Sequence, residues 1–166
     1  GVPVIPLIET PMGVLNAPYL ISEESPCVFF GCEDLATGLG LLDPMPLNML
    51  YAAQHVVFHC RAKGIPVVGT VGPFSLIHSN WSGEFRNILK ASRDLGFSGS
   101  YAVDPKQLKW IRSVFEFDDE VARINEIVAA APDQKPVFMF QGRMYGPPML
   151  KRYRNILEKL KRSKSR

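Results

Sequence analysis

The chain has 166 residues, of which 46% are hydrophobic and 21% charged, so its composition is that of a folded globular domain and excludes a disordered segment. The net charge of +3 is unevenly distributed along the chain. Residues 151–166 carry eight of the 19 Lys and Arg residues and one acid, whereas the first 150 residues carry 15 acids and 11 bases. This distribution argues against a nucleic-acid-binding face on the body of the protein, and no apolar run approaches the roughly 18 residues that span a membrane.

The hydrophobic pattern predicts strands that alternate with helices. In chain order, we expect a strand at residues 2–8, a short helix at 13–22, a strand at 26–31, a helical turn at 33–38, a long helix at 47–63, a strand at 65–71 and a helix at 83–95. We then expect a short strand at 99–103, a helix that opens at Pro105 with Asp104 as N-cap, a helix at 118–131, an extended segment at 137–140 and a basic helix at 147–162. Such alternation predicts an α/β fold with a parallel sheet.

Two carboxylates follow neighbouring predicted strands. Glu9 ends the first strand, and Asp34 comes shortly after the second, beyond Gly31. Ligands of parallel α/β proteins bind at this edge of the sheet, and paired carboxylates suit Mg²⁺. Other interpretations stay open: Glu9 pairs with a basic residue, Asp34 caps the following helix, or Glu33 takes the inward position in place of Asp34.

The cysteines and histidines predict no further metal site. Cys27, Cys32 and Cys60 are odd in number and lack metal-site spacing, so we expect buried, reduced thiols in a cytoplasmic protein. His55 and His59 lie one helical turn apart, but the Glu of an HExxH motif is absent between them. We expect both on a helix surface.

Five sets of segments carry motifs in the order found in one known family. They are residues 6–17 (PLIETPMGVLNA), 30–40 (FGCEDLATGLG), 62–68 (AKGIPVV), 95–107 (LGFSGSYAVDPKQ) and 141–148 (QGRMYGPP). Together they resemble the citrate lyase beta-subunit-like proteins, which include malyl-CoA and citramalyl-CoA lyases, of the HpcH/HpaI aldolase family. The resemblance implies a (β/α)8 TIM barrel, of which this chain supplies about the last four β/α units and a C-terminal lid helix.

The same resemblance implies a division of the chain and a longer parent protein. Residues 1–131 would form the C-terminal half of the barrel, and residues 132–166 the lid segment and basic helix. Because a complete barrel needs about 250 residues, we expect an upstream half to precede this sequence. The family is also oligomeric, so we expect a trimer or hexamer in which the C-terminal segment covers a neighbouring subunit's site.

The function that the resemblance implies is a Mg²⁺-dependent carbon–carbon lyase or aldolase acting on a keto-acid and an acyl-CoA thioester. Metal ligands would be Glu9 and Asp34. The substrate carboxylate would meet the backbone at Gly31, Cys32 and Glu33, and the acyl-CoA would lie near Val103 and Asp104.

Four positions depart from the family pattern. Gly146 stands where the lid usually carries an Asp that serves as acid and base, and a glycine transfers no proton. Asp104, Ser100 and Gly38 stand where a His, a Lys and an Asp are usual. No catalytic acid or base is therefore assigned, and the alternative function is a weakened homologue that binds metal and ligand in a regulatory or scaffold role.

Overall fold

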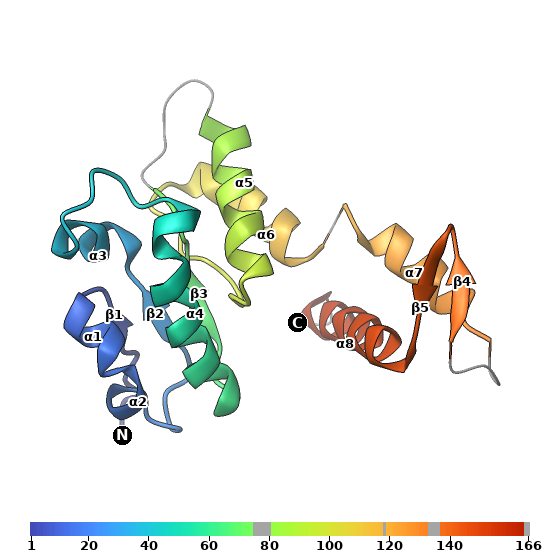
Figure 1. Cartoon of the computed structure of the whole chain (residues 1–166), viewed down its shortest axis with the longest axis horizontal. Coiled ribbons are helices and arrows are strands. Elements are labelled where there is room, and N and C mark those ends of the chain that lie inside the picture. Colours follow the sequence, from blue (N-terminus) through green and yellow to red (C-terminus); the bar gives the residue numbers. More distant parts are fainter. Residues whose placement is uncertain (75–80, 118, 133–136, 165–166) are drawn as a thin grey trace. The chain divides into compact units, whose positions relative to one another are not determined.

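The structure is a computed structural model that describes residues 1–74, 81–117, 119–132 and 137–164. The chain forms two compact units, Gly1–Phe115 and Glu116–Arg166 (Figure 1). This division lies before the expected boundary at 131, because helix α7 (Val121–Ala129) belongs to the second unit. There its Ile127 packs in one apolar cluster with Tyr145 and Leu150.

The first unit holds a three-stranded parallel sheet and its crossover helices. Its elements are β1 (Leu7–Ile8), α1 (Pro11–Leu15), α2 (Ala17–Leu20), β2 (Val28–Phe30), α3 (Cys32–Gly38), α4 (Pro46–Ala62), β3 (Val67–Gly69), α5 (Trp81–Asp94), a short 3-10 helix η1 (Pro105–Gln107) and α6 (Leu108–Phe115). The strand order is β1-β2-β3, with Leu7 opposite Phe29 and Phe30 opposite Gly69. The prediction of an α/β fold with parallel strands is confirmed, while the barrel that these strands would form part of stays a prediction.

Prolines explain why two expected elements are shorter than predicted. The first strand is reduced to β1, since Pro3 and Pro6 lack the N–H groups that a sheet ladder needs, although the Pro6 carbonyl still accepts from Phe29 N at 2.8 Å. The helix expected at 13–22 is broken at Asn16 into α1 and α2. Pro18 stands in the first turn of α2, where a missing N–H costs nothing, but it could not continue α1.

The expected strand at 99–103 is reduced to one parallel bridge between Val68 and Gly99. Ser98 N donates to Val67 O at 2.7 Å, and Gly69 N donates to Gly99 O at 3.1 Å. The segment makes no further bridge to β3 beyond Gly99, and the amides of Val103 and Asp104 bond instead to the side chain of Gln107.

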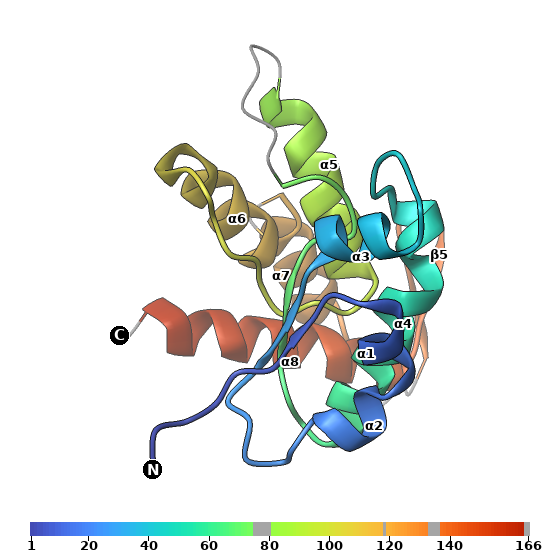
Figure 2. The ribbon, with the colours of Figure 1, turned by 90° about the vertical axis from the view of Figure 1, so that its left-hand side faces the viewer.

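One face of the sheet carries the main apolar core. Ile8, Val28, Phe30 and Val67 are fully or nearly fully buried and pack with residues of α4. Figure 2 shows α1, α2 and α4 on one side of the strands. Leu7 and Phe29 alternate with the buried positions and face the other side, which these helices leave uncovered.

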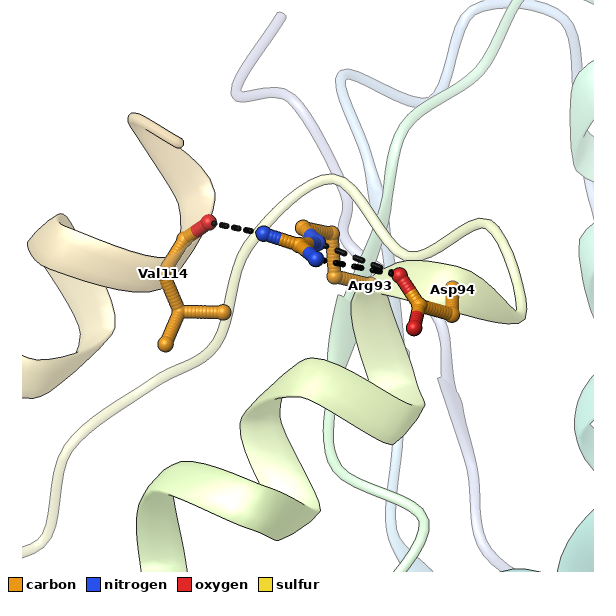
Figure 3. Close-up of polar contacts among 3 residues, drawn as sticks. All are labelled: Arg93, Asp94 and Val114. Carbon is orange, nitrogen blue, oxygen red and sulfur yellow. Dashed lines mark hydrogen bonds and ion pairs between the residues drawn. The ribbon is translucent and has the colours of Figure 1, made fainter. Parts of the chain in front are cut away.

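An arginine links the two helices that follow the sheet. Arg93, in the last turn of α5, donates to the Val114 carbonyl at the end of α6 at 3.1 Å and pairs with Asp94 at 3.2 Å (Figure 3). This contact satisfies a C-terminal carbonyl that α6 cannot pair internally. It thereby holds α6, and the segment before it, against α5.

The second unit is a hairpin packed with two helices. It contains α7, β4 (Phe138–Phe140), β5 (Arg143–Tyr145) and α8 (Pro147–Lys164). The antiparallel turn has positive φ at Gln141 (48°) and Gly142 (75°), the conformation that two-residue hairpins require. In the residues that the structure describes, no helix is long and apolar enough to cross a bilayer.

Candidate active site

A pocket of ≈ 340 Å³ lies on the sheet face that α1, α2 and α4 leave uncovered. Its lining comes from the ends of β1 and β2, the start of α3, the segment after β3 and the segment before η1. The lining residues are Leu7, Glu9, Phe29, Gly31, Glu33, Asp34, Phe74, Tyr101 and Val103. Of the predicted site residues, the structure brings together the two carboxylates Glu9 and Asp34 with Gly31, Glu33 and Val103.

Gly31 makes room for the Glu9 side chain. It is the N-cap residue of α3, and its N–H donates to the Ile8 carbonyl of the neighbouring strand at 3.0 Å. A methyl group at this position would lie 2.7 Å from Cβ and 3.0 Å from Oε2 of Glu9. The close approach of the two strand ends therefore depends on a residue without a side chain.

Asp34 lies close enough to Glu9 to affect the ionisation of Glu9. The pKa of Glu9 is raised above its usual 4.5 by partial burial, then by the negative charge of Asp34 and by a hydrogen bond with the Asp34 carboxyl group. Among the described residues that line the pocket there are three carboxylates and no Lys, Arg or His. Mg²⁺ is bound in proteins through one or two carboxylates, so the pair Glu9 and Asp34 fits this metal.

Two of the alternative interpretations can be compared with this geometry. Asp34 is in the first turn of α3, whose N-cap is Gly31 and which has no side-chain cap, so Asp34 does not cap that helix. Glu33 and Asp34 both line the pocket, so the expected competition between them does not arise. Both face the pocket because the helix begins only at Cys32 and presents its first turn to the sheet edge.

The Cys32 side chain points away from the pocket. Its Sγ donates to the Gly72 carbonyl at 3.2 Å and lies 3.6 Å from the Thr70 hydroxyl, in the buried core. Burial raises the pKa of this thiol to about 11. Cys32 can therefore offer a ligand only its backbone. All three cysteines are free thiols; Cys32 and Cys60 are buried as predicted, whereas Cys27 is half-buried.

Aromatic side chains form one wall of the pocket. The Tyr101 ring lies 5.5 Å from the Phe29 ring and 5.1 Å, edge to face, from the Phe74 ring. The Tyr101 hydroxyl donates to the Phe30 carbonyl at 3.2 Å. Burial, followed by nearby negative charges, raises the pKa of Tyr101, so the phenol keeps its proton at any physiological pH.

Val103 and Asp104, the two residues expected near the acyl-CoA, have different surroundings. Val103 is 56% exposed and lines the pocket. Asp104 does not line it, because its carboxylate caps η1 and accepts from Lys106 N at 2.7 Å. The expected cap at Pro105 is therefore confirmed.

Gly38 and Gly146, two of the positions at which the resemblance implies another residue, differ in the space around them. A methyl group at Gly38 would lie 2.9 Å from Cδ of Pro11, so a larger residue there requires the α1 segment to move. Gly146 is different, since a methyl group there would meet only ordinary contacts, at 3.8 Å from Val137 and 3.9 Å from Pro148. The second unit could accommodate a side chain at Gly146 without strain.

His55 and His59 lie outside the pocket, and His78 lies outside the described residues. His55 and His59 are half-buried on α4, with ring centroids 4.7 Å apart in an edge-to-face arrangement. Partial burial, then His55 and Lys63, lower the pKa of His59. Within the described parts of the chain, no cluster of three or more His, Cys, Asp or Glu could hold a metal.

Known proteins resemble this chain over most of its length. Residues 1–105, which contain the whole pocket, match the model of the HpcH/HpaI aldolase/citrate lyase family. The chain belongs to this family. It is 32% identical to a citrate lyase subunit beta-like protein of Deinococcus radiodurans, over 93% of this chain and 56% of that protein. It is 28% identical to the mitochondrial citramalyl-CoA lyase of Rattus norvegicus, over 92% of this chain and 49% of that protein.

Solved structures of the family have the same fold. CitE from Mycobacterium tuberculosis, in complex with magnesium, acetoacetate and coenzyme A, aligns with a TM-score of 0.75 at 18% identity, over 95% of this chain and 61% of that one. A citrate lyase from Burkholderia xenovorans LB400 aligns with a TM-score of 0.73 at 18% identity, over 98% and 54%. The chain spans about half the length of the curated relatives that it matches.

Sequence reasoning missed the apolar side of this site. Leu7 and Phe29 could have been found from strand alternation, since they stand two residues before Glu9 and Gly31. Phe74 and Tyr101 gave no such signal, because they reach the pocket from segments that are not regular strands.

Proposed function

We propose that this chain is part of a Mg²⁺-dependent carbon–carbon lyase or aldolase that acts on a keto-acid and an acyl-CoA thioester. The observation that carries the proposal is the pair of carboxylates, Glu9 and Asp34, at the mouth of the pocket, beside a glycine that leaves room for them. The family relationship supports the reaction class, since its named members include citrate lyase beta subunits and citramalyl-CoA lyases.

Glu9 and Asp34 would hold the Mg²⁺ ion. When bound, the ion supplies positive charge that stabilises an enolate oxygen as it forms. The backbone at Gly31, Cys32 and Glu33 would meet the carboxylate of the keto-acid. The Cys32 side chain is turned into the core, so Cys32 could meet the substrate only through its backbone.

The other residues of the pocket would orient the substrate and exclude water. Phe29, Phe74 and Tyr101 form an apolar wall on which the carbon skeleton of a small acid can lie. The exposed Val103 would contact the acyl-CoA. Asp104 would act on that ligand only through the loop that it caps, because its carboxylate is already engaged.

The experiment that tests this proposal uses the full-length protein. We expect Mg²⁺-dependent release of acetyl-CoA from at least one of malyl-CoA, citramalyl-CoA and citryl-CoA, with loss of turnover in EDTA. Binding of Mg²⁺ and of pyruvate or oxaloacetate is measured in parallel by calorimetry. Absence of turnover on all three thioesters, with keto-acid binding retained, would reject the lyase.

The second candidate is a catalytically weakened homologue that binds metal and ligand for a regulatory or scaffold purpose. The observation in its favour is Gly146, which offers no proton-transferring group where the family usually has one. Because a side chain fits at this position, Gly146→Asp is a direct test. A turnover that appears only in the variant supports the weakened homologue, whereas equal turnover in both proteins supports an intact enzyme with another acid.

We further propose that the second unit takes part in assembly, as a lid in a cytoplasmic trimer or hexamer. Its last helix, α8, packs its apolar side on α7 and the hairpin and keeps Lys151, Arg152, Arg154 and Lys159 exposed. A deletion of 116–166 removes this whole unit without cutting through its core. The proposal predicts a smaller assembly or weaker ligand binding, as measured by light scattering and calorimetry, and unchanged values for both would contradict it.

A further inference from the structure

Gln107 is a polar side chain with no exposed surface, at the end of η1. Its Nε2 donates to the Phe74 carbonyl at 2.6 Å, and its Oε1 accepts from the backbone N–H of Val103 at 2.9 Å and of Asp104 at 3.3 Å. A buried amide is costly unless its donor and acceptor are both satisfied, and here they are.

These hydrogen bonds join two segments that no sheet ladder connects. The parallel pairing with β3 ends at Gly99, so the backbone at Val103 has left the sheet. Phe74 lies beyond the end of β3, on the other segment. The side-chain amide of Gln107 bonds to both segments and so joins them where no backbone pairing between strands does.

Both segments reach the pocket. Phe74 and Val103 line it directly, and the Phe74 ring packs edge to face against the Tyr101 ring. Tyr101 is held from its other end by the bond from its hydroxyl to Phe30 O. The wall of the pocket is thus a chain of contacts that runs from Gln107 through Phe74 to Tyr101.

We propose that Gln107 is a positioning residue for the organic ligand: it fixes the Phe74–Tyr101–Val103 wall of the pocket. This inference rests on the proposed function, because it concerns the keto-acid that this pocket would bind. Gln107 would thus support the side of the site that binds the organic ligand and not the side that binds the metal. Glu9 and Asp34 are carried by the ends of β1 and the start of α3, neither of which bonds to Gln107.

A purely structural role would give a different pattern of effects. Gln107 also completes the cap of η1 with Asp104, and loss of that cap lowers stability whether or not the pocket is affected. The bond to Phe74 O is not part of the cap. Its loss should release the wall and weaken ligand binding, while leaving the metal ligands in place.

The test compares Gln107→Met with the wild type in the full-length protein. Methionine has a similar length and volume but cannot donate to Phe74 O. We expect the affinity for pyruvate, measured by calorimetry in saturating Mg²⁺, to fall by about 10-fold, the upper end of the net contribution of one hydrogen bond. The affinity for Mg²⁺ alone should not change, because Gln107 bonds to Phe74, Val103 and Asp104 and to neither proposed metal ligand.

The matched control is Gln54→Met, at an exposed position of α4, which should leave both affinities unchanged. If Gln107→Met does not fold, Gln107→Asn keeps the amide but is one methylene too short to reach both partners, and the same split is expected. Unchanged pyruvate affinity in a folded variant, with only the melting temperature lowered, would overturn the inference. An equal loss of Mg²⁺ and pyruvate affinity would overturn it as well. Failure of the wild type itself to bind Mg²⁺ and keto-acid would instead reject the proposed function.

Discussion

Gly31→Ala is a sensitive test of the metal site, because a single methyl group would collide with a proposed ligand. The added Cβ would lie 2.7 Å from Cβ and 3.0 Å from Oε2 of Glu9. Carbon atoms in contact prefer about 3.5–4.0 Å, so Cβ of Glu9, and with it the backbone at the end of β1, must move by about 1 Å. The backbone at Gly31 has φ of −97°, which alanine adopts readily, so the effect is steric.

Two consequences follow from a displacement of this size. Overpacking of this kind costs about 1–3 kcal/mol of the free energy of unfolding. Mg²⁺ demands near-ideal geometry at about 2.0–2.1 Å, so a carboxylate displaced by about 1 Å no longer serves as a ligand. We expect Mg²⁺ affinity to fall by at least about 10-fold.

The assay separates the two effects. Thermal unfolding in EDTA reports the steric cost alone, and calorimetric titration with Mg²⁺ reports the loss of the ligand. The matched control is Gly99→Ala in the same sheet, where a methyl group meets nothing within 4 Å. Wild-type Mg²⁺ affinity in Gly31→Ala would refute the placement of Glu9 as a metal ligand.

Three further predictions concern ionisation in and around the pocket. Glu9→Gln should abolish Mg²⁺ binding. The same change should raise the melting temperature of the metal-free protein, because burial and the charge of Asp34 disfavour the ionised form of Glu9. A melting temperature below that of the wild type in EDTA would contradict this reasoning. Because the pKa of Glu9 is raised above 4.5, its contribution to the free energy of unfolding of the metal-free protein is complete below pH 4.5 and is lost as the pH rises through the raised pKa. The affinity for Mg²⁺ should change in the opposite sense and weaken as the pH falls through the same pKa. Calorimetry across this pH range, with Glu9→Gln as reference, measures the direction of both changes. Burial raises the pKa of the Cys32 and Cys60 thiols to about 11. At pH 8 a disulfide reagent should therefore label the half-buried Cys27 first and the other two cysteines only after denaturation. Rapid labelling of all three in the folded protein would be inconsistent with the buried core.

The sequence by itself determined most of the regular elements of this protein. The helix expected at 47–63 is α4, and the one at 147–162 is α8, because apolar periodicity and end signals such as Gly64 are local properties. The cap that Asp104 forms at Pro105 was predicted for the same reason. The carboxylates Glu9 and Asp34 were also predicted to converge, since parallel strands bring their carboxyl ends to one edge.

Only the tertiary structure decided how the pocket is closed on its apolar side. Tyr101 and Phe74 meet across 27 residues of sequence, and the amide of Gln107 holds Phe74 from 33 residues away. The same amide accepts from Val103 N at the place where the expected fourth strand no longer pairs with β3. Periodicity reports which face of an element is buried. It carries no information on a side chain that bonds to the backbone of a distant segment, so this wall had to be seen in three dimensions.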